Sequence, residues 1–183
     1  MTGAVILAAG AGSRLGGVAK ALLVHQGRTF LENIARLVSG PCVVVVAEPF
    51  RDEVTRHARS LELVVVDNPA PERGMASSVA LGFTAAQGFA VDAAYLWPVD
   101  HPFVQPSTLV QLEATPGLAR PTYRGRGGHP PRIPRALWGR FATCDQTDGG
   151  ARAVMATLDV TDVPVDDPGV VRDVDTPADR EAR

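Results

Sequence analysis

The sequence is poor in cysteine, in net charge and in long apolar runs, and each shortage excludes a class of protein. Its two cysteines, Cys42 and Cys144, are too few and too far apart in sequence for a disulfide framework or a zinc site. A net charge of −2 gives no general attraction to nucleic acid or to membranes. No apolar run reaches membrane-spanning length, and the N-terminus lacks the basic start of a signal peptide. We therefore expect a cytoplasmic protein whose cysteines are reduced.

Lysine is scarcer still. Lys20 is the only lysine among the 18 Lys and Arg residues, and it follows a glycine-rich stretch. A lysine in a chain that otherwise uses arginine indicates that a compact ammonium is needed there rather than a forked guanidinium. An ordinary surface lysine explains the same observation equally well.

The stretch before Lys20 is typical of an anion site. Residues 5–7 are a short apolar run, which predicts a buried parallel strand. Residues 8–12 follow, and their small side chains let backbone N–H groups approach a ligand closely. A strand that enters such a loop, with basic residues downstream, predicts a phosphate cradle. The loop matches neither GxGxxG nor the P-loop, because Leu15 and Val18 stand where those motifs need glycine and lysine.

The run LAAGAGSRLGGVAK resembles the LAAGxxxRxG…K signature of nucleotidyltransferases related to the molybdenum cofactor enzymes. Ala19 replaces the usual proline, and one extra residue precedes Lys20. The resemblance implies that the loop binds the phosphates of a nucleoside triphosphate and that Arg14 and Lys20 are catalytic cations. The nucleotide-binding residues that it implies in this stretch are Leu7, Ala8, Ala9, Gly10, Ala11, Gly12, Ser13, Arg14 and Lys20.

The rest of the chain alternates apolar strands with helices. Cys42–Val46, residues 63–66 and residues 93–99 predict further strands, and Thr29 with Glu32 predicts a capping box at the start of a helix. This alternation predicts an α/β fold with a mostly parallel sheet and helices on both faces. With the resemblance, we expect a single three-layer, Rossmann-like nucleotidyltransferase domain over residues 1–183. Ligands of such sheets bind beyond the carboxyl ends of the strands.

A second candidate segment, residues 68–78, follows one of these strands. Taken alone, it fits an ordinary loop whose serines cap a helix. It also resembles the N-P-x-x-x-x-G-M-x-x-S segment of the same family, which reads the base and ribose. The resemblance implies four further nucleotide contacts, Asn68, Gly74, Ser77 and Ser78.

Two acidic positions are candidates for a metal site. Asp100 ends an apolar strand at the sheet edge that carries the glycine loop, where a hard cation could bridge protein and phosphate oxygens, although a turn or cap explains it too. Asp173 and Asp175 are two residues apart, so an extended segment places them on one face. The family motifs D-x-P and D-x-D-T-P-x-D imply that Asp100 and Asp175 hold Mg²⁺, with Asp100 also catalytic and Asp173 the alternative second ligand.

The acceptor contacts are implied by weaker matches. Gly128, His129 and the following proline resemble the Gly-His-Pro of the cytidylyltransferase branch, which favours that branch over its guanylyl relatives. His101 stands where the family often has glutamine, and Arg152 lies in a segment similar to G-D-x-G-A-R. The resemblance therefore implies acceptor binding by His101, Gly128, His129 and Arg152. A hairpin turn and the first turn of a helix explain the last three equally well.

Together these segments predict a nucleotidyltransferase similar to molybdenum cofactor cytidylyltransferases. We expect it to transfer a nucleotide from a triphosphate, CTP in preference, to a phosphorylated acceptor such as the molybdopterin cofactor, with release of pyrophosphate. A contact with a molybdoenzyme or chaperone is a further expectation. A sugar phosphate is the alternative acceptor, and an NAD-dependent oxidoreductase and a non-catalytic nucleotide-binding module are alternative functions. Glu48 offers the acid that a dinucleotide site needs, but it lies far beyond the expected spacing of about 20 residues.

Overall fold

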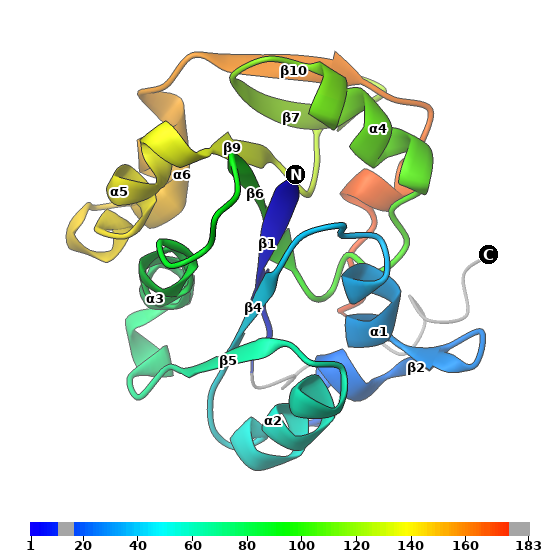
Figure 1. Cartoon of the computed structure of the whole chain (residues 1–183), viewed down its shortest axis with the longest axis vertical. Helices are drawn as coiled ribbons and strands as arrows, with labels where there is room; N and C mark the ends of the chain where they lie inside the picture. The colour runs from blue at the N-terminus through cyan, green and yellow to red at the C-terminus, as the bar shows by residue number, and fades with distance from the viewer. Residues whose placement is uncertain (11–16, 176–183) are drawn as a thin grey trace.

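Strands from distant parts of the chain lie side by side in one sheet of the computed structural model, which describes residues 1–10 and 17–175. The order across the sheet is β10, β7, β9, β6, β1, β4 and β5, and β8 pairs with β7 (Figure 1). The bounds are β1 Thr2–Leu7, β4 Cys42–Val46, β5 Val64–Asp67, β6 Ala93–Pro98, β7 Leu118–Tyr123, β8 Arg126–Gly127, β9 Arg132–Pro134 and β10 Val160–Pro164. A separate hairpin pairs β2 Val24–His25 with β3 Arg28–Thr29.

The sheet is mostly parallel, as the strand–helix alternation predicts. β1 runs parallel to both of its neighbours, β4 and β6, and the pairs β4–β5 and β7–β10 are also parallel. β9 is antiparallel to β6 and β7, and β8 is antiparallel to β7. The apolar pattern did not predict these two strands, because they come from a segment rich in glycine, proline and arginine.

Helices cover both faces of this sheet, which confirms the three-layer prediction. Figure 1 shows α1, α2 and α4 on one side and α3, α5 and α6 on the other. The bounds are α1 Phe30–Ala35, α2 Arg51–Ser60, α3 Met75–Ala86, α4 Pro106–Ala114, α5 Trp138–Phe141 and α6 Gly150–Ala156. No helix in the described part of the chain combines the length and the apolar character that crossing a membrane requires.

Each face of the sheet builds its own apolar core, because successive strand residues point to opposite sides. On β1, Ile6 packs in the core beneath α1, α2 and α4, whereas Val5 packs in the core beneath α3, α5 and α6. Both side chains are fully buried. Strands buried on both faces read as continuous apolar runs, which is why β1 and β4 could be identified from the sequence.

The start of α1 matches the sequence better than its end. Thr29 accepts from the backbone N of Glu32 at 3.1 Å and the Glu32 carboxylate accepts from the Thr29 backbone N at 2.6 Å, so the predicted capping box is present. Apolar residues continue at helical spacing to Val38, but α1 ends at Ala35. Short i to i−3 hydrogen bonds, such as Leu37 N to Ile34 O at 3.0 Å, tighten the last turn.

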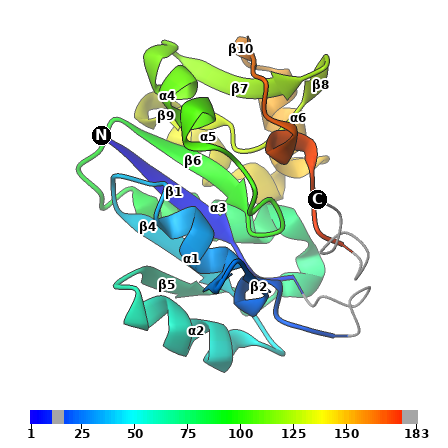
Figure 2. The same ribbon diagram turned by 90° about the vertical axis from the view of Figure 1, so that its right-hand side faces the viewer.

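The carboxyl ends of the three central strands lie at one edge of the sheet. Backbone hydrogen bonds join the segments that follow neighbouring strands. Val99 N, just after β6, donates to Leu7 O at the end of β1 at 3.1 Å, and Asn68 N, just after β5, donates to Val46 O at the end of β4 at 2.8 Å. The segment after β10 descends toward the same edge, as Figure 2 shows, and Val174 N donates to Asp100 O at 2.9 Å. The fold therefore brings three predicted site segments and the C-terminal segment together.

Candidate active site

A cavity of about 570 Å³ opens at this edge of the sheet. Its wall comes from the ends of β1 and β6, from the loop that enters α3, and from single residues of other segments. The lining residues are Leu7, Ala8, Ala9, Gly10, Lys20, Glu48, Pro71, Glu72, Gly74, Met75, Ser78, Pro98, Val99, Asp100 and Asp175. This volume falls within the range of small-molecule sites in proteins.

The loop after β1 forms one side of the cavity. Leu7, Ala8, Ala9 and Gly10, all predicted to bind nucleotide, line it. The predicted nucleotide-binding residues Ala11, Gly12, Ser13 and Arg14 lie outside the described residues. The structure therefore describes the predicted phosphate loop only where it leaves β1 and again near Lys20.

Lys20 joins the two predicted metal carboxylates. It begins the short helix η2, Lys20–Leu22, and its side chain is 14% exposed. Lys20 Nζ donates to Asp100 Oδ2 at 3.2 Å and forms a second, shorter hydrogen bond with Asp175 Oδ1. The extra residue before Lys20 thus does not prevent it from reaching the site. Asp173 is exposed, whereas Asp175 lines the cavity, so the geometry favours Asp175 of the two.

Lys20 and Asp100 carry their charges at neutral pH. Burial alone would lower the pKa of Lys20, but hydrogen bonds and charges from Asp175 and Asp100 outweigh it and raise that pKa. Burial alone would raise the pKa of Asp100, but His101 and Lys20 outweigh it and lower that pKa. A half-buried ammonium therefore lies between two carboxylate side chains.

Two histidines extend the cluster. His101 Nδ1 lies 3.0 Å from Asp100 Oδ1, and the rings of His101 and His129 are 4.7 Å apart. Burial and the neighbouring His101 lower the pKa of His129 to about 4, so this ring is neutral at pH 7. Within the described residues, the buried Nδ1 of His129 has no hydrogen-bond partner.

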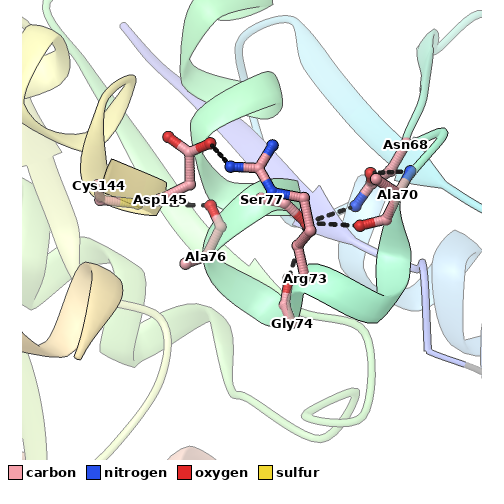
Figure 3. A network of polar contacts seen from close by, with 8 residues as sticks. All are labelled: Asn68, Ala70, Arg73, Gly74, Ala76, Ser77, Cys144 and Asp145. Carbon is pink, nitrogen blue, oxygen red and sulfur yellow. Dashed lines mark hydrogen bonds and ion pairs between the residues drawn. The ribbon is translucent and has the colours of Figure 1, made fainter. Parts of the chain in front are cut away.

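The loop that enters α3 is held by a buried polar network (Figure 3). Asn68 Nδ2 donates to both Ser77 Oγ and Ser78 Oγ at 2.9 Å, and Asn68 Oδ1 accepts from Ala70 N at 3.0 Å. Ser77 Oγ donates to Gly74 O at 2.8 Å. Asn68, Ser77 and Ser78 are all at most 4% exposed. The polar groups of Asn68 are thus used within the loop, and of these three side chains Ser78 lines the cavity.

Gly74 allows this loop to turn into the helix. Its φ is +86°, a conformation that side chains other than glycine rarely adopt, and it occupies the N-cap position of α3. It also lines the cavity, as expected for a predicted nucleotide contact. An ion pair between Arg73 Nη2 and Asp145 Oδ2, 2.9 Å long, fixes the outer side of the loop (Figure 3).

The predicted acceptor residues separate into two groups. His101 and His129 lie beside Asp100, and Gly128 is buried against the backbone of Val170. Arg152 is exposed on α6 and does not line the cavity. None of the four residues lines the cavity: His101 and His129 lie next to Asp100, whereas Gly128 and Arg152 lie apart from it.

Sequence reasoning missed part of the wall, most notably Glu48, Glu72 and Met75. Glu48 was judged only against the dinucleotide spacing, which argued against a role. It lies just beyond the end of β4, next to β1, so the rule that ligands bind at strand ends could have found it. Arg51 Nη2 holds Glu48 Oε1 at 2.9 Å, while Met75 and Glu72 stay exposed at the mouth of the cavity.

The chemistry of the donor set fits a hard divalent cation. Asp100 and Asp175 come from distant segments and converge on one cationic group, Lys20 Nζ. Within the described residues there is no group of three or more His, Cys, Asp or Glu side chains that could hold a metal by itself. Mg²⁺ usually takes one or two carboxylates together with substrate phosphates, and this pair meets that requirement.

Comparison with known proteins identifies close relatives. The family model for a MobA-like NTP transferase domain matches residues 4–163. A molybdenum cofactor guanylyltransferase from Acidiphilium cryptum is 39% identical over 116 residues, which cover 63% of this chain and 59% of that protein. The chain therefore matches less than two thirds of the length of that relative. A nicotine blue oxidoreductase from Paenarthrobacter nicotinovorans is 33% identical over 164 residues, 82% of this chain and 79% of that protein.

Solved structures share the whole fold. Rv0371c from Mycobacterium tuberculosis superposes with a TM-score of 0.78 at 25% identity, covering 99% of this chain and 96% of that one. The same protein has been solved in complex with manganese, and that structure superposes with a TM-score of 0.74 at 23% identity, covering 98% and 96%.

Proposed function

The chain belongs to the MobA-like NTP transferase family, and from that premise we propose that it transfers CMP from CTP to a phosphorylated acceptor such as the molybdopterin cofactor. A phosphate oxygen of the acceptor attacks the α-phosphorus of the triphosphate. The new P–O bond forms in line with the bond to the β-phosphate, which breaks, and pyrophosphate leaves. Such a transfer depends on positioning and charge neutralisation more than on covalent participation by the protein.

The observation that carries this proposal is the contact of Lys20 with both Asp100 and Asp175 at the wall of a strand-end cavity. A transferase of this kind needs carboxylates to hold a cation and a cation to neutralise phosphate charge. When bound, Mg²⁺ would supply Lewis-acid neutralisation of the phosphate oxygens between these carboxylates. Lys20 would donate to the oxygens of the α-phosphate, and Arg14 with the loop amides would hold the leaving pyrophosphate.

Cytosine is the proposed base because Gly128, His129 and Pro130 resemble the cytidylyltransferase branch. The likeness to a guanylyltransferase makes GTP the alternative that an experiment must separate. Ser78, Gly74 and Met75 line the cavity on the side of the α3 loop, where the base and ribose would lie. Asn68 and Ser77 would hold this loop in place through their hydrogen bonds within it.

The acceptor would bind beside the two histidines. His101 is bonded to Asp100, and the ring of His129 lies 4.7 Å from that of His101, which supports an approach of the incoming phosphate on this side of Asp100. Arg152 would take part only with an acceptor long enough to reach α6. A sugar phosphate is the alternative acceptor. The cytoplasmic location and the contact with a molybdoenzyme or chaperone stay predictions.

A second candidate function follows from the likeness to a nicotine blue oxidoreductase. An oxidoreductase that uses NAD would place the dinucleotide in the same cavity, and Glu48 at the end of β4 would accept from the ribose hydroxyls. Such an enzyme would not need Lys20 between two carboxylates. The two functions therefore differ in their dependence on a divalent cation.

Thermal unfolding in the presence of CTP, GTP, ATP, UTP or NAD, each with and without Mg²⁺, tests these alternatives. A ligand at 100 times its Kd stabilises the folded protein by about 2.7 kcal/mol, which is enough to rank nucleotides. A Mg²⁺-dependent shift that is largest for CTP supports the proposal. If GTP gives the largest shift, the proposed transfer reaction stands but guanine replaces cytosine as the base. A shift with NAD alone supports the oxidoreductase.

Release of pyrophosphate from the stabilising triphosphate, with a pterin phosphate as acceptor, then tests the reaction itself. Asp100→Asn is expected to abolish release. Asp162→Asn is the matched control, because Asp162 is an exposed carboxylate on β10 that pairs with Arg120 at 2.8 Å and does not line the cavity. Full activity of Asp100→Asn would refute the proposed role of the carboxylates.

A further inference from the structure

One buried carboxylate outside the cavity stands out in the segment that leads to Asp175. Asp167 is 2% exposed. Its Oδ2 accepts from Gln105 N at 2.8 Å and from Thr108 Oγ1 at 2.7 Å, and its Oδ1 accepts from Gly169 N at 2.9 Å. A buried carboxyl group with this many donors is firmly held, because its oxygens have lost their hydration and depend on these donors for hydrogen bonds.

These donors belong to two different segments. Gln105 is the N-cap residue of α4, and its own side chain makes no cap hydrogen bond. Asp167, which lies 62 residues away in sequence, takes over that role and bonds a free N–H of the helix start. Its other oxygen bonds Gly169 in η6, Pro168–Val171. Asp167 thus fastens the start of α4 to the beginning of the C-terminal segment.

The same two segments carry the predicted metal pair. Segment 100–105 begins with Asp100 and ends at the helix start, while segment 167–175 begins with Asp167 and ends with Asp175. They are joined near the site by the hydrogen bond from Val174 N to Asp100 O, 2.9 Å long. Between these two ends, the Arg172 guanidinium lies 4.3 Å from the centre of the Phe103 ring.

The two segments also pack closely beside Asp167. A Cβ placed on Gly169 would lie 2.2 Å from the backbone oxygen of Phe103, so only glycine allows this approach. The hydrogen bonds of Asp167 hold the segments at this distance. A loss of those bonds would release the C-terminal segment at the end remote from the cavity and change the angle at which it delivers Asp175.

We propose that Asp167 is a positioning residue for the metal pair: by fastening segment 167–175 to the start of α4, it sets the separation of Asp175 from Asp100. This inference rests on the proposed function, since it assumes that the pair holds a divalent cation. Asp167 itself touches neither the cation nor the nucleotide. Partners that orient metal ligands from outside typically change metal affinity by roughly 10-fold to 100-fold when they are replaced.

Two variants test how far the hydrogen bonds of Asp167 determine the position of Asp175. Asp167→Asn keeps the shape but replaces one of the two accepting oxygens by an NH2 group, so either the donors of Gln105 and Thr108 or the N–H of Gly169 lose their acceptor. Thr108→Val keeps the carboxylate and removes one of its partners. Thr2→Val is the matched control: Thr2 is also buried, at 2% exposed, but it lies at the amino end of β1, away from the cavity.

Two affinities are measured. EPR gives the Kd for Mn²⁺ in the presence of α,β-methylene-CTP, and a second titration in EDTA gives the metal-free Kd for the same nucleotide. We expect the Kd for Mn²⁺ to rise at least about 10-fold in Asp167→Asn and by less in Thr108→Val. Metal-free nucleotide binding should stay within about twofold of wild type in all variants, and Thr2→Val should keep the Mn²⁺ affinity. A merely structural role would instead weaken both ligands together.

Wild-type Mn²⁺ affinity in a folded Asp167→Asn, or parallel losses of Mn²⁺ and nucleotide binding, would overturn the inference and leave the proposed function intact. A wild-type protein that binds neither Mn²⁺ nor nucleotide would overturn both. If Asp167→Asn does not fold, Thr108→Val decides the question, because unchanged Mn²⁺ affinity in that variant also overturns the inference.

Discussion

Lys20 Nζ lies 3.2 Å from Asp100 Oδ2, although 80 positions separate the two residues in the sequence. The same ammonium contacts Asp175. Two carboxylates brought this close repel one another unless a cation lies between them. In the absence of a metal ion, Lys20 supplies that cation. A divalent ion held by both carboxylates would take the place of Lys20, whose ammonium could then neutralise phosphate charge.

Lys20→Met tests this exchange. Methionine has nearly the same length and no charge, so the two carboxylates lose their internal counter-ion and should bind Mn²⁺ at least several-fold more tightly. Transfer of the nucleotide should fall by about 100-fold or more, because charge on the α-phosphate is no longer neutralised. EPR titration measures the affinity for Mn²⁺, and an assay of pyrophosphate release measures the rate of nucleotide transfer. Weaker Mn²⁺ binding in Lys20→Met would contradict the displacement of Lys20 by the metal.

The second predicted ligand can be separated from its neighbour. Asp175 contacts Lys20 and lines the cavity, whereas Asp173 is exposed. We expect Asp175→Asn to abolish Mg²⁺-dependent stabilisation by the triphosphate and Asp173→Asn to keep it. The same thermal unfolding experiment measures both variants. An equal loss in the two variants would show that the segment acts as a whole rather than through Asp175.

The sequence identified the positions of this site better than their roles. Lys20 and Asp100 follow strands of opposite halves of the chain, and the strand-end rule placed them together correctly. Asn68 and Ser77 are predicted to contact the nucleotide, and in the structure both are buried and bond within the loop. A motif shows that a residue type is needed at a position. It does not distinguish a side chain that contacts a ligand from one that shapes the loop around it.

Asn68→Ala measures the strength of the loop network. The hydroxyls of Ser77 and Ser78 and the backbone N of Ala70 would lose a buried partner, so we expect a loss of roughly 1–3 kcal/mol in the free energy of unfolding. The affinity for the triphosphate should fall as well, because Ser78 and Gly74 line the cavity. Urea unfolding and calorimetric titration with the nucleotide measure the two effects.

Arg73→Gln is the companion variant. It removes the ion pair with Asp145 from the same loop, but Arg73 is 56% exposed, and such surface pairs contribute about 0–1 kcal/mol. A larger loss of stability in Arg73→Gln than in Asn68→Ala would mean that the outer ion pair, not the buried amide, holds the loop.

The fold was predictable where burial is uniform and unpredictable where it is not. β4 is buried throughout and reads as an unbroken apolar run, so the sequence places it well, whereas only residues 5–7 of β1 were predicted and the strand begins at Thr2. β9 contains Arg132 and Pro134 around a single buried Ile133, and nothing in that pattern indicates a strand inserted antiparallel between β6 and β7. Its position follows from tertiary pairing, which local patterns do not record.

The neutral state of His129 leads to a pH dependence of stability. Burial and His101 lower its pKa in the folded protein to about 4, whereas an unfolded histidine titrates near 6.5. Between these values the unfolded chain binds a proton that the folded protein does not. The free energy of unfolding should therefore fall as the pH decreases from about 6.5 to about 4, by roughly 2–3 kcal/mol from this residue, and the contribution is fully present above pH 6.5.

His129→Asn isolates that contribution, because asparagine does not titrate in this range. Urea unfolding at pH 7, 5.5 and 4.5 should show a steep loss of stability in the wild type and a flatter profile in the variant, whatever their difference at pH 7. The result is the slope of the free energy of unfolding against pH. A loss of stability that is the same at every pH, caused by the missing ring, does not change that slope. Equal slopes in the two proteins would mean that His129 accepts a proton in the folded state as readily as in the unfolded chain. Its buried Nδ1 would then have to be solvated or paired in solution.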